Sequence, residues 1–252
     1  MPLGTRIREI VCSLNHGRCG TMSKLRKLPW VCIAILTMCS CKSDSDHLLT
    51  AIRQKDVATV RRYIATRVDL NPTSGLHEVN KPLPYAAAYG NLEIVKLLIQ
   101  NGADLNGRVA YGDVALIKAD EHGNDDVLEY LIRQGADVNA PNYFGVTPFI
   151  GLCGRGRLNL VQLAIQHGAD VNSCFVAKGG EGAGKMNLSP LQAAASYGRR
   201  DVVELLLSHG ANPGATDYMG RSSVDLAKSQ GHTAIATLLQ KHLAAKKTDT
   251  AK

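Results

Sequence analysis

The chain has 252 residues, with 29 Lys and Arg against 22 Asp and Glu, which gives a formal net charge of +7. The excess positive charge lies at the N-terminal end, because residues 1–41 hold six bases and one acid. Residues 42–252 carry 23 bases and 21 acids, so their net charge is near +2. This balance gives no sign of nucleic-acid binding or of strong electrostatic steering of a charged partner.

An apolar run of 11 residues, 28–38, follows a basic stretch at 23–27. The run is too short to cross a bilayer as a helix and has the length of the apolar part of a secretory signal. It ends at Met38-Cys39-Ser40-Cys41, which resembles the lipobox of bacterial lipoproteins. Residues 1–41 are therefore predicted to be an N-terminal extension with a lipoprotein-type signal segment. Cys41 is the favoured lipidation site and Cys39 the alternative.

Residues 42–46 are predicted to form a short tether after the lipidated cysteine. Residue 42 is Lys rather than Asp. By the resemblance to bacterial lipoproteins, this favours a lipid anchor in the inner leaflet of the outer membrane, facing the periplasm. Plain secretion and a chance hydrophobic N-terminus stay open as alternatives. The start stays open between Met1, Met22 and Met38, and a start at Met38 would give a minor cytosolic form.

A short phrase recurs along the rest of the chain. Gly-Ala-Asp-Leu-Asn at 102–106 returns as Gly-Ala-Asp-Val-Asn at 135–139 and 168–172, then as Gly-Ala-Asn-Pro at 210–213. The first three copies are about 33 residues apart, a period that predicts stacked structural repeats. Repeats of this length cannot bury their apolar faces alone, so neighbouring units must share a core.

Two helical segments precede each copy of the phrase. The second has apolar residues at i, i+3 and i+4 spacing, which predicts one buried face; these segments are 92–99, 127–132, 158–165 and 202–207. The first is shorter, rich in alanine and ends in glycine, as in 83–90, 191–198 and 224–231. Thr147-Pro148 and Ser189-Pro190 supply a hydroxyl N-cap and a proline in the first turn of two such helices.

These segments resemble the ankyrin repeat, with a turn, a Thr-Pro-Leu-like helix start, Ala-Ala, Gly, a second helix and then Gly-Ala-Asp-x-Asn. The resemblance implies an all-α ankyrin-repeat solenoid of helix-turn-helix units with β-turn fingers. The predicted stack covers 47–243, followed by a disordered tail at 244–252. Its units are about 47–71, 72–106, 107–139, 140–172, 173–214 and 215–243.

Two units depart from the pattern. Unit 107–139 has Val114-Ala115 in place of Thr-Pro, and Asp120 where the second alanine usually lies. Unit 140–172 has Gly151, Gly154 and Gly156 in its first helix. Each glycine costs roughly 0.5–1 kcal/mol against alanine in a helix. We therefore expect the middle of the stack to be its least stable part.

A search for catalytic chemistry finds one lookalike. Residues 179–185 have the Gly-x4-Gly-Lys spacing of a phosphate-binding loop, but Met186 replaces the Ser or Thr that would hold Mg²⁺. The segment lies in an insertion between repeats, so we interpret it as a flexible Gly-rich turn or, alternatively, a partner-contacting finger. The histidines have no metal-ligand spacing, and no hydrolase motif is present. We expect no enzyme, cofactor or metal site.

Several recurring side chains are predicted to be structural. Asp104, Asp137 and Asp170 recur with the repeat and are expected to bond nearby N–H groups in turns. His167 and His209 are expected at solvent-facing helix ends. Cys153 is expected to be a buried free thiol, with a Cys153–Cys174 disulfide as the alternative in an oxidising periplasm.

The ankyrin resemblance implies binding through the turn tips and the exposed side of the first helices. Outside the leader the chain has eleven aromatic residues, and six fall on these two surfaces. Tyr and Arg dominate binding hot spots because they combine apolar area with a polar group. The predicted partner-binding residues are Tyr89, Tyr111, Tyr143, Phe144, Arg155, Tyr197 and Tyr218. The alternative is that some of them pack against the next unit's turn.

The function expected from these features is protein binding by a lipid-anchored periplasmic protein. Bacterial ankyrin-like lipoproteins resemble immunity proteins, so the leading hypothesis is an inhibitor that sterically blocks a secreted toxin, such as an antibacterial phospholipase. A scaffold or chaperone for an envelope enzyme is a second hypothesis. A secreted effector directed at host cells is a third, and the lipobox-like leader argues against it.

Overall fold

The computed structural model describes residues 45–72, 81–174 and 188–249. These residues belong to one compact unit, Ser45–Lys252. The predicted signal segment with Cys39 and Cys41 lies outside the described residues, as does the phosphate-loop lookalike at 179–185.

The described part is built from pairs of antiparallel helices, one pair for each repeat. A helix over residues 45–53 pairs with α3. The helices that follow are α3 (Val57–Ala65), α4 (Pro82–Tyr89), α5 (Leu92–Gln100), α6 (Ala115–His122), α7 (Asp125–Arg133), α8 (Pro148–Arg155), α9 (Leu158–Gln166), α10 (Pro190–Ser196), α11 (Arg200–Ser208), α12 (Ser223–Ser229) and α13 (Thr233–Asp249), with the 3-10 turn η2 (Ala110–Gly112) before α6.

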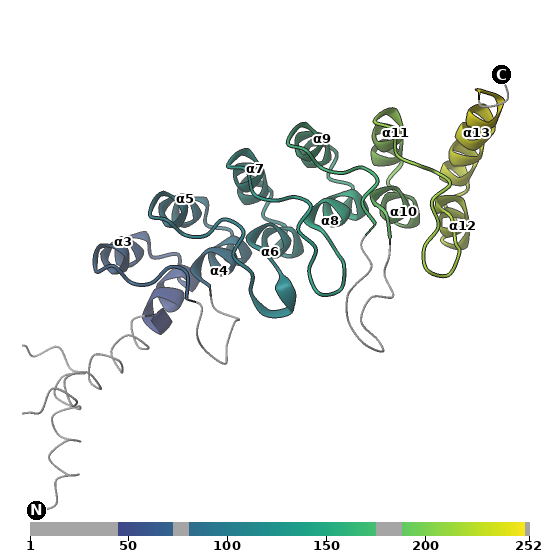
Figure 1. Cartoon of the computed structure of the whole chain (residues 1–252). Coiled ribbons are helices and arrows are strands. Elements are labelled where there is room, and N and C mark those ends of the chain that lie inside the picture. Colours follow the sequence, from purple (N-terminus) through teal and green to yellow (C-terminus); the bar gives the residue numbers. More distant parts are fainter. Residues whose placement is uncertain (1–44, 73–80, 175–187, 250–252) are drawn as a thin grey trace, which may run out of the picture. The chain divides into compact units, whose positions relative to one another are not determined.

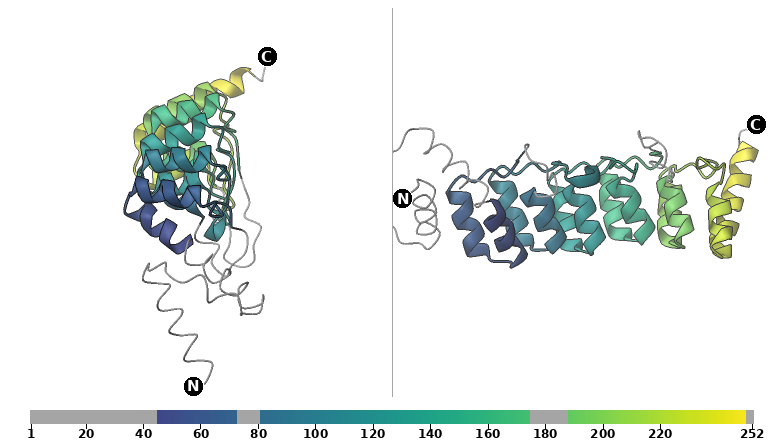
Figure 2. Two further views of the ribbon diagram at one scale, coloured as in Figure 1. Left: turned by 90° about the vertical axis from the view of Figure 1, so that its left-hand side faces the viewer. Right: turned by 90° about the horizontal axis from the view of Figure 1, so that it is seen from below.

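The pairs stack so that equivalent helices lie side by side. α4, α6, α8, α10 and α12 contact one another in that order and form an inner row, while α3, α5, α7, α9 and α11 form an outer row. Figure 1 shows the inner row below the outer row, with the connecting loops extending beyond the inner helices, and Figure 2 shows the same stack from the side and from below. No β-strand occurs in the described residues apart from an isolated bridge between Thr216 and Ser222. The protein is therefore an all-α repeat solenoid.

Local chemistry fixes where the inner helices begin and end. The Thr147 hydroxyl accepts the N–H of Ile150 at 3.2 Å, and Ser189 forms a reciprocal capping box with Gln192. Both helices have proline in the first turn, as predicted. Gly156 ends α8 with a left-handed backbone, φ +78°. It is thus a C-cap, and the expectation that it lies inside the helix with Gly151 and Gly154 is wrong.

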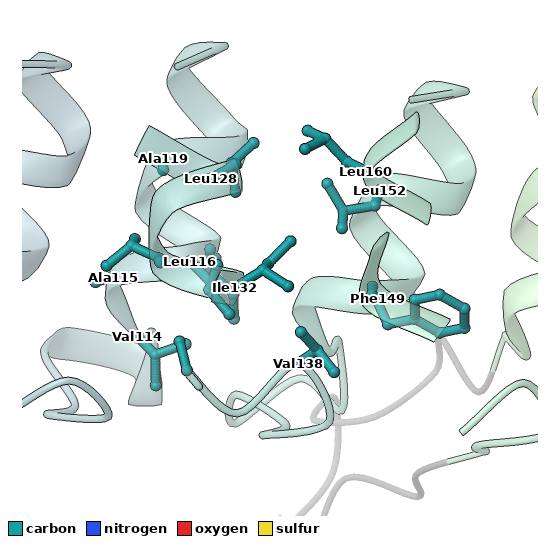
Figure 3. Packing of buried hydrophobic residues seen from close by; sticks show 14 of the residues in the cluster. Val114, Ala115, Leu116, Ala119, Leu128, Ile132, Val138, Phe149, Leu152 and Leu160 are labelled. Carbon is teal, nitrogen blue, oxygen red and sulfur yellow. The ribbon is translucent and has the colours of Figure 1, made fainter. Parts of the chain in front are cut away.

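The core runs without interruption through the stack. Its side chains come from both helix rows and from the loops; Figure 3 shows Val114, Leu116, Leu128, Ile132, Val138, Phe149, Leu152 and Leu160. Phe149, just after the α8 cap, is fully buried. Alanines such as Ala86, Ala119 and Ala194 are also fully buried, which lets adjacent inner helices approach closely.

In the first four repeats, hydrogen bonds of one asparagine tie each unit to the next. Asn139, for example, accepts the N–H of Asp170 and donates to the carbonyl of Gly168, both at 2.9 Å. We call this set the asparagine ladder; its members are Asn71, Asn106, Asn139 and Asn172. The Asp104, Asp137 and Asp170 carboxylates each accept the N–H two residues further on, so the prediction of a turn-forming role is confirmed.

Two boundaries differ from the sequence prediction. The first helix that the structure describes already includes residues 45 and 46, which belong to the predicted tether 42–46. α13 continues to Asp249, although 244–252 was expected to be disordered. The segment from Leu243 to Lys247 consists of Leu, Ala and Lys, which have high helix propensity and extend the last helix.

Candidate partner-binding surface

Three aromatic side chains lie together at the tips of two adjacent loops. The first loop, 107–114, carries Tyr111, and the second, 140–147, carries Tyr143 and Phe144; their exposed fractions are 63%, 59% and 47%. The rings of Tyr111 and Phe144 have centroids 5.8 Å apart. We call the two loops the first and second fingers, and the three residues the finger cluster. Exposed aromatic groups that are adjacent in space are typical of protein-binding surfaces.

The backbone of the two fingers holds this cluster in place. Tyr111 has a left-handed backbone, φ +61°, which is uncommon outside glycine, and its carbonyl accepts the N–H of Tyr143 at 2.8 Å. Gly112 gives the Tyr143 ring room, because a Cβ at Gly112 would lie 2.8 Å from Cδ1 of Tyr143. The Tyr143 ring therefore lies against the neighbouring finger, and its position depends on both turns.

Asn142 organises the second finger from within. Its Oδ1 accepts the N–H groups of Phe144 and Val146, both at 3.0 Å, and its Nδ2 donates to Asp113 at 2.9 Å. Asp113 is buried and is also paired with Lys118 at 2.7 Å. This network links the two fingers to α6, so the cluster is presented by an ordered scaffold.

A groove lies next to the second finger, between the inner helices α8 and α10. Its volume is about 310 Å³, and it is lined by Val146, Ile150, Gly151, Gly154, Arg155, Leu188, Ala193, Tyr197 and Arg199. Both glycines lack a side chain here: a Cβ at Gly154 would face Tyr197 and Ala193 of α10, whereas a Cβ at Gly151 would face Asp120 of α6. The predicted residues Arg155 and Tyr197 both lie on this groove, and Val146 connects it to the second finger.

A buried carboxylate on α6, the inner helix on the other side of α8 from α10, joins two repeats. The side chain of Asp120, on α6, is 7% exposed and pairs with Nε of Arg155 at 2.8 Å and Nε of Arg157 at 3.3 Å. Burial raises the pKa of the Asp120 carboxyl, and the hydrogen bond and charge of Arg155 oppose this shift. Gly151 leaves room for this carboxylate, because a Cβ there would lie 2.6 Å from Oδ2 of Asp120 and the carboxylate would have to shift. Arg157 also pairs with Asp125.

The other predicted residues lie apart from this surface. Tyr89, at the end of α4, is half-buried, and its ring lies 4.8 Å from that of Tyr85, whose hydroxyl accepts hydrogen bonds from Arg53. Tyr218 is exposed on the last finger, 214–222, beside the exposed Met219. The structure therefore groups Tyr111, Tyr143 and Phe144 at the fingertips and Arg155 with Tyr197 on the groove, and leaves Tyr89 and Tyr218 separate.

Sequence reasoning missed Asp120 and Arg199 as parts of this surface. Asp120 was noted only as a departure from alanine, and Arg199 was not singled out. The sequence did hold a signal for Asp120. An acid replaces a small residue in one unit, and Arg155 and Arg157 occupy nearby positions in the next unit. For Arg199 no such signal exists, since its place on the groove depends on the glycines of the preceding unit.

Three further sequence predictions concern metal sites, the repeat histidines and Cys153. Among residues 45–72, 81–174 and 188–249, no group of three or more His, Cys, Asp or Glu side chains is placed to hold a metal ion. His167 and His209 cap the ends of α9 and α11 and are exposed, as expected. The Cys153 thiol is free and fully buried, and burial raises its pKa well above the usual value, so it is poorly reactive. None of the helices that the structure describes has the length and apolar character of a membrane span.

The comparisons with known proteins match the repeats. The chain is 37% identical over 82 residues to the "Probable E3 ubiquitin-protein ligase XBOS33" of Oryza sativa, a match that covers 32% of this chain and 16% of that protein. It is 37% identical over 79 residues to the "E3 ubiquitin-protein ligase XBAT33" of Arabidopsis thaliana, covering 31% and 15% of the two chains. It is 41% identical over 63 residues to mouse "Rabankyrin-5", covering 25% and 5%. In each case the chain matches less than a fifth of the relative's length.

A family model supplies the identification. The model described as "Ankyrin repeats (3 copies)" matches residues 48–142, 119–217 and 153–251, which together cover most of the chain. These matches coincide with the stacked helix pairs and the finger loops described above. The chain belongs to the ankyrin-repeat family, whose repeats bind other proteins.

Proposed function

We propose that this protein is a periplasmic inhibitor that binds a secreted toxin, such as an antibacterial phospholipase, and blocks it sterically. A lipid on Cys41, or on Cys39, would hold it at the outer membrane. The observation that carries the binding role is the finger cluster, where Tyr111, Tyr143 and Phe144 remain exposed on two linked loops. The lipobox-like leader supports the periplasmic location, and a membrane tether would place the inhibitor where a lipid-attacking enzyme acts.

The physical reason for choosing the finger cluster is the free energy gained by covering it. Burying apolar surface contributes about 25 cal/mol per Å², and Tyr and Phe offer large areas with few rotatable bonds. The hydrogen bonds in the two turns already order the backbone that carries these side chains, so little further backbone entropy is lost on binding. A toxin whose active-site mouth lies against the fingers would then be closed to its substrate.

The relatives do not change this proposal. Two of those compared carry names of E3 ubiquitin-protein ligases, and their likeness to this chain is confined to a stretch of about 80 residues. We therefore extend from them only the capacity to bind a protein, not a ligase activity.

The binding role is tested with the full-length chain and the protein captured with it from its native cell envelope. Replacing Tyr143 and Phe144 together by alanine is expected to weaken binding by several kcal/mol while the far-UV circular dichroism stays unchanged. Leu158→Ala is the matched control, because Leu158 is an exposed apolar residue on the outer helix α9. Unchanged affinity in the double variant would show that the fingers are not the binding surface.

The inhibitor role and its location need two further experiments. Cells that lack the gene are expected to be killed by toxin-secreting siblings. The full-length protein should restore survival, but a variant with Cys39 and Cys41 both replaced by serine should not. A deletion strain that survives its siblings would favour the scaffold hypothesis. Metabolic labelling with a fatty-acid analogue is expected to mark the wild-type chain and to fail with Cys39 and Cys41 both replaced by serine. Absence of label in the wild-type chain would overturn the lipid anchor and favour the effector hypothesis.

A further inference from the structure

We propose that the groove between α8 and α10 is a separate recognition subsite, which takes an apolar side chain of the partner next to an Asp or Glu. The proposal rests on the protein-binding function and adds the chemistry of the partner segment. It concerns Gly151, Gly154, Tyr197 and Arg199, none of which belongs to the finger cluster.

The shape of the groove favours a short segment of polypeptide. Its volume of about 310 Å³ lies at the lower end of the range for ligand pockets, enough for one or two side chains. Gly151 and Gly154 place bare backbone at its floor, and Ala193 of α10 adds only a methyl group. Ile150, Val146 and Leu188 supply further apolar surface. An aliphatic side chain fits this lining, whereas a strongly polar group would lose its hydration there.

Tyr197 and Gly154 form one wall together. The Tyr197 side chain is 56% exposed and lies across Gly154, since a Cβ at Gly154 would be 3.2 Å from Cδ2 of the ring. The ring is therefore supported by the neighbouring repeat while its other face is open. A partner side chain that enters the groove would cover this face.

The charge at the rim favours a carboxylate. Arg199 donates from Nε to the carbonyl of Gly154 at 3.0 Å, which places its guanidinium at the groove. Within the described residues no acidic side chain forms a salt bridge with Arg199, and its other nitrogens remain available for a partner. Arg155 and Arg157, by contrast, share Asp120 and Asp125.

The surrounding groups preserve this positive charge. Asp120, on α6, does not line the groove and is engaged by Arg155 and Arg157, so it does not neutralise Arg199. His232 lies against Gly198, next to Arg199 in the chain, and adds no negative charge. An arginine anchored at Nε presents its remaining N–H groups in a fixed geometry, which suits a carboxylate better than a neutral amide.

The test uses random 12-residue peptides displayed on phage and panned against the immobilised full-length chain. Enrichment of sequences in which Leu, Ile, Val or Met adjoins Asp or Glu is the expected result. A synthetic peptide of the enriched sequence should lose at least tenfold in affinity, by fluorescence anisotropy, when Arg199 is replaced by glutamine. Replacing its acidic residue by the matching amide should have a similar effect on the wild-type protein.

Arg200→Gln is the matched control. Arg200 is the next residue in the chain, but it pairs with Glu204 on the exposed face of α11. Its replacement should leave the peptide affinity unchanged. Gly154→Ala is a second variant, in which the added methyl group crowds the Tyr197 ring. Gly154→Ala should weaken peptide binding several-fold without loss of helix content. This variant keeps the proposal testable if the Arg199→Gln protein does not fold.

The outcomes separate this subsite from the finger proposal. Peptide binding that survives Tyr143→Ala with Phe144→Ala but not Arg199→Gln supports the subsite, whatever the fingers do. Enriched peptides without an acidic residue, or with equal affinity for the Arg199 and Arg200 variants, would overturn it, as would the absence of enrichment. A dimer in analytical ultracentrifugation that Arg199→Gln dissociates would also overturn it, because a second copy would then occupy the groove.

Discussion

Asp217 shows how one carboxylate can hold a whole loop. Its Oδ1 accepts the N–H groups of Met219 and Arg221, both at 2.9 Å, while its Oδ2 accepts Nε of Arg221 at 2.8 Å. Burial acts to raise the pKa of Asp217, but the hydrogen bonds and the charge of Arg221 outweigh it, so the pKa lies below the ordinary value. The last finger, with Tyr218 at its tip, is therefore most ordered when Asp217 is ionised.

A test of this account compares wild type with Asp217→Asn across pH. A lowered pKa in the folded state contributes stability above the unfolded-state pKa, and this contribution is lost as pH falls through the folded-state pKa. The variant is therefore expected to be less stable by about 1 kcal/mol at pH 7, with the difference shrinking below about pH 4. Urea unfolding followed by circular dichroism at pH 7 and pH 3 measures this. A difference that stays constant with pH would show that the charge of Asp217 plays no part.

The residue scale is also where the sequence was least predictive. The recurring aspartates of the turns were assigned correctly because each bonds a group two residues away. Asp120 was not, since its partners Arg155 and Arg157 belong to the next unit and the distance along the chain does not show which positions face each other. Tyr89 looked equivalent to Tyr197, yet it is half-buried beside Tyr85, a tyrosine that has no counterpart near Tyr197.

The helix pair was the element most predictable from sequence. Its two periodicities, the apolar spacing within helices and the 33-residue period between units, depend on contacts that every repeat makes in the same way. Caps such as Thr147 and Ser189 act within four residues, so they too could be read directly. The groove could not be predicted, because it arises where two helices meet and one of them, α8, has glycine at residues 151 and 154.

The asparagine ladder makes a prediction at this scale. Asn139→Ala removes two hydrogen bonds that cross from one unit to the next, so it is expected to lower the free energy of unfolding by about 1–2 kcal/mol. Asn159→Ala, at an exposed position of α9, is the control and should change stability little. Equal denaturation midpoints for the two variants would mean that water replaces the ladder bonds at no net cost.

For the whole molecule, stability in a stacked array is the sum of each unit's own stability and its interfaces with neighbours. Gly151 and Gly154 lower the helix propensity of α8, but both support side chains from adjacent repeats, Asp120 on one side and Tyr197 on the other. The contacts between repeats thus offset part of the stability that α8 loses through its glycines. The prediction of a less stable middle then concerns local unfolding of α8 rather than unfolding of the whole stack.

Hydrogen exchange measured by mass spectrometry tests this prediction. Peptides from α8 are expected to exchange faster than those from its inner-row neighbours α6 and α10, because each glycine costs roughly 0.5–1 kcal/mol against alanine. Gly154→Ala should slow the exchange of peptides from α8. Peptides from the equivalent helix α4 provide an internal reference for the exchange rate. Slower exchange in α8 than in both neighbours would contradict the expectation.

The asparagine ladder also bears on how such a chain changes length. Asn71, Asn139 and Asn172 each accept one N–H and donate to one carbonyl of the next unit, whether the accepted N–H lies 31 residues further along the chain, as at Asp170, or 40, as at Asn212. These hydrogen bonds between repeats therefore do not depend on the length of the chain between the two bonded residues. A whole repeat can therefore be duplicated, or a loop lengthened, while the hydrogen bonds between neighbouring repeats stay the same. The size of the partner-binding surface can then change by one repeat at a time.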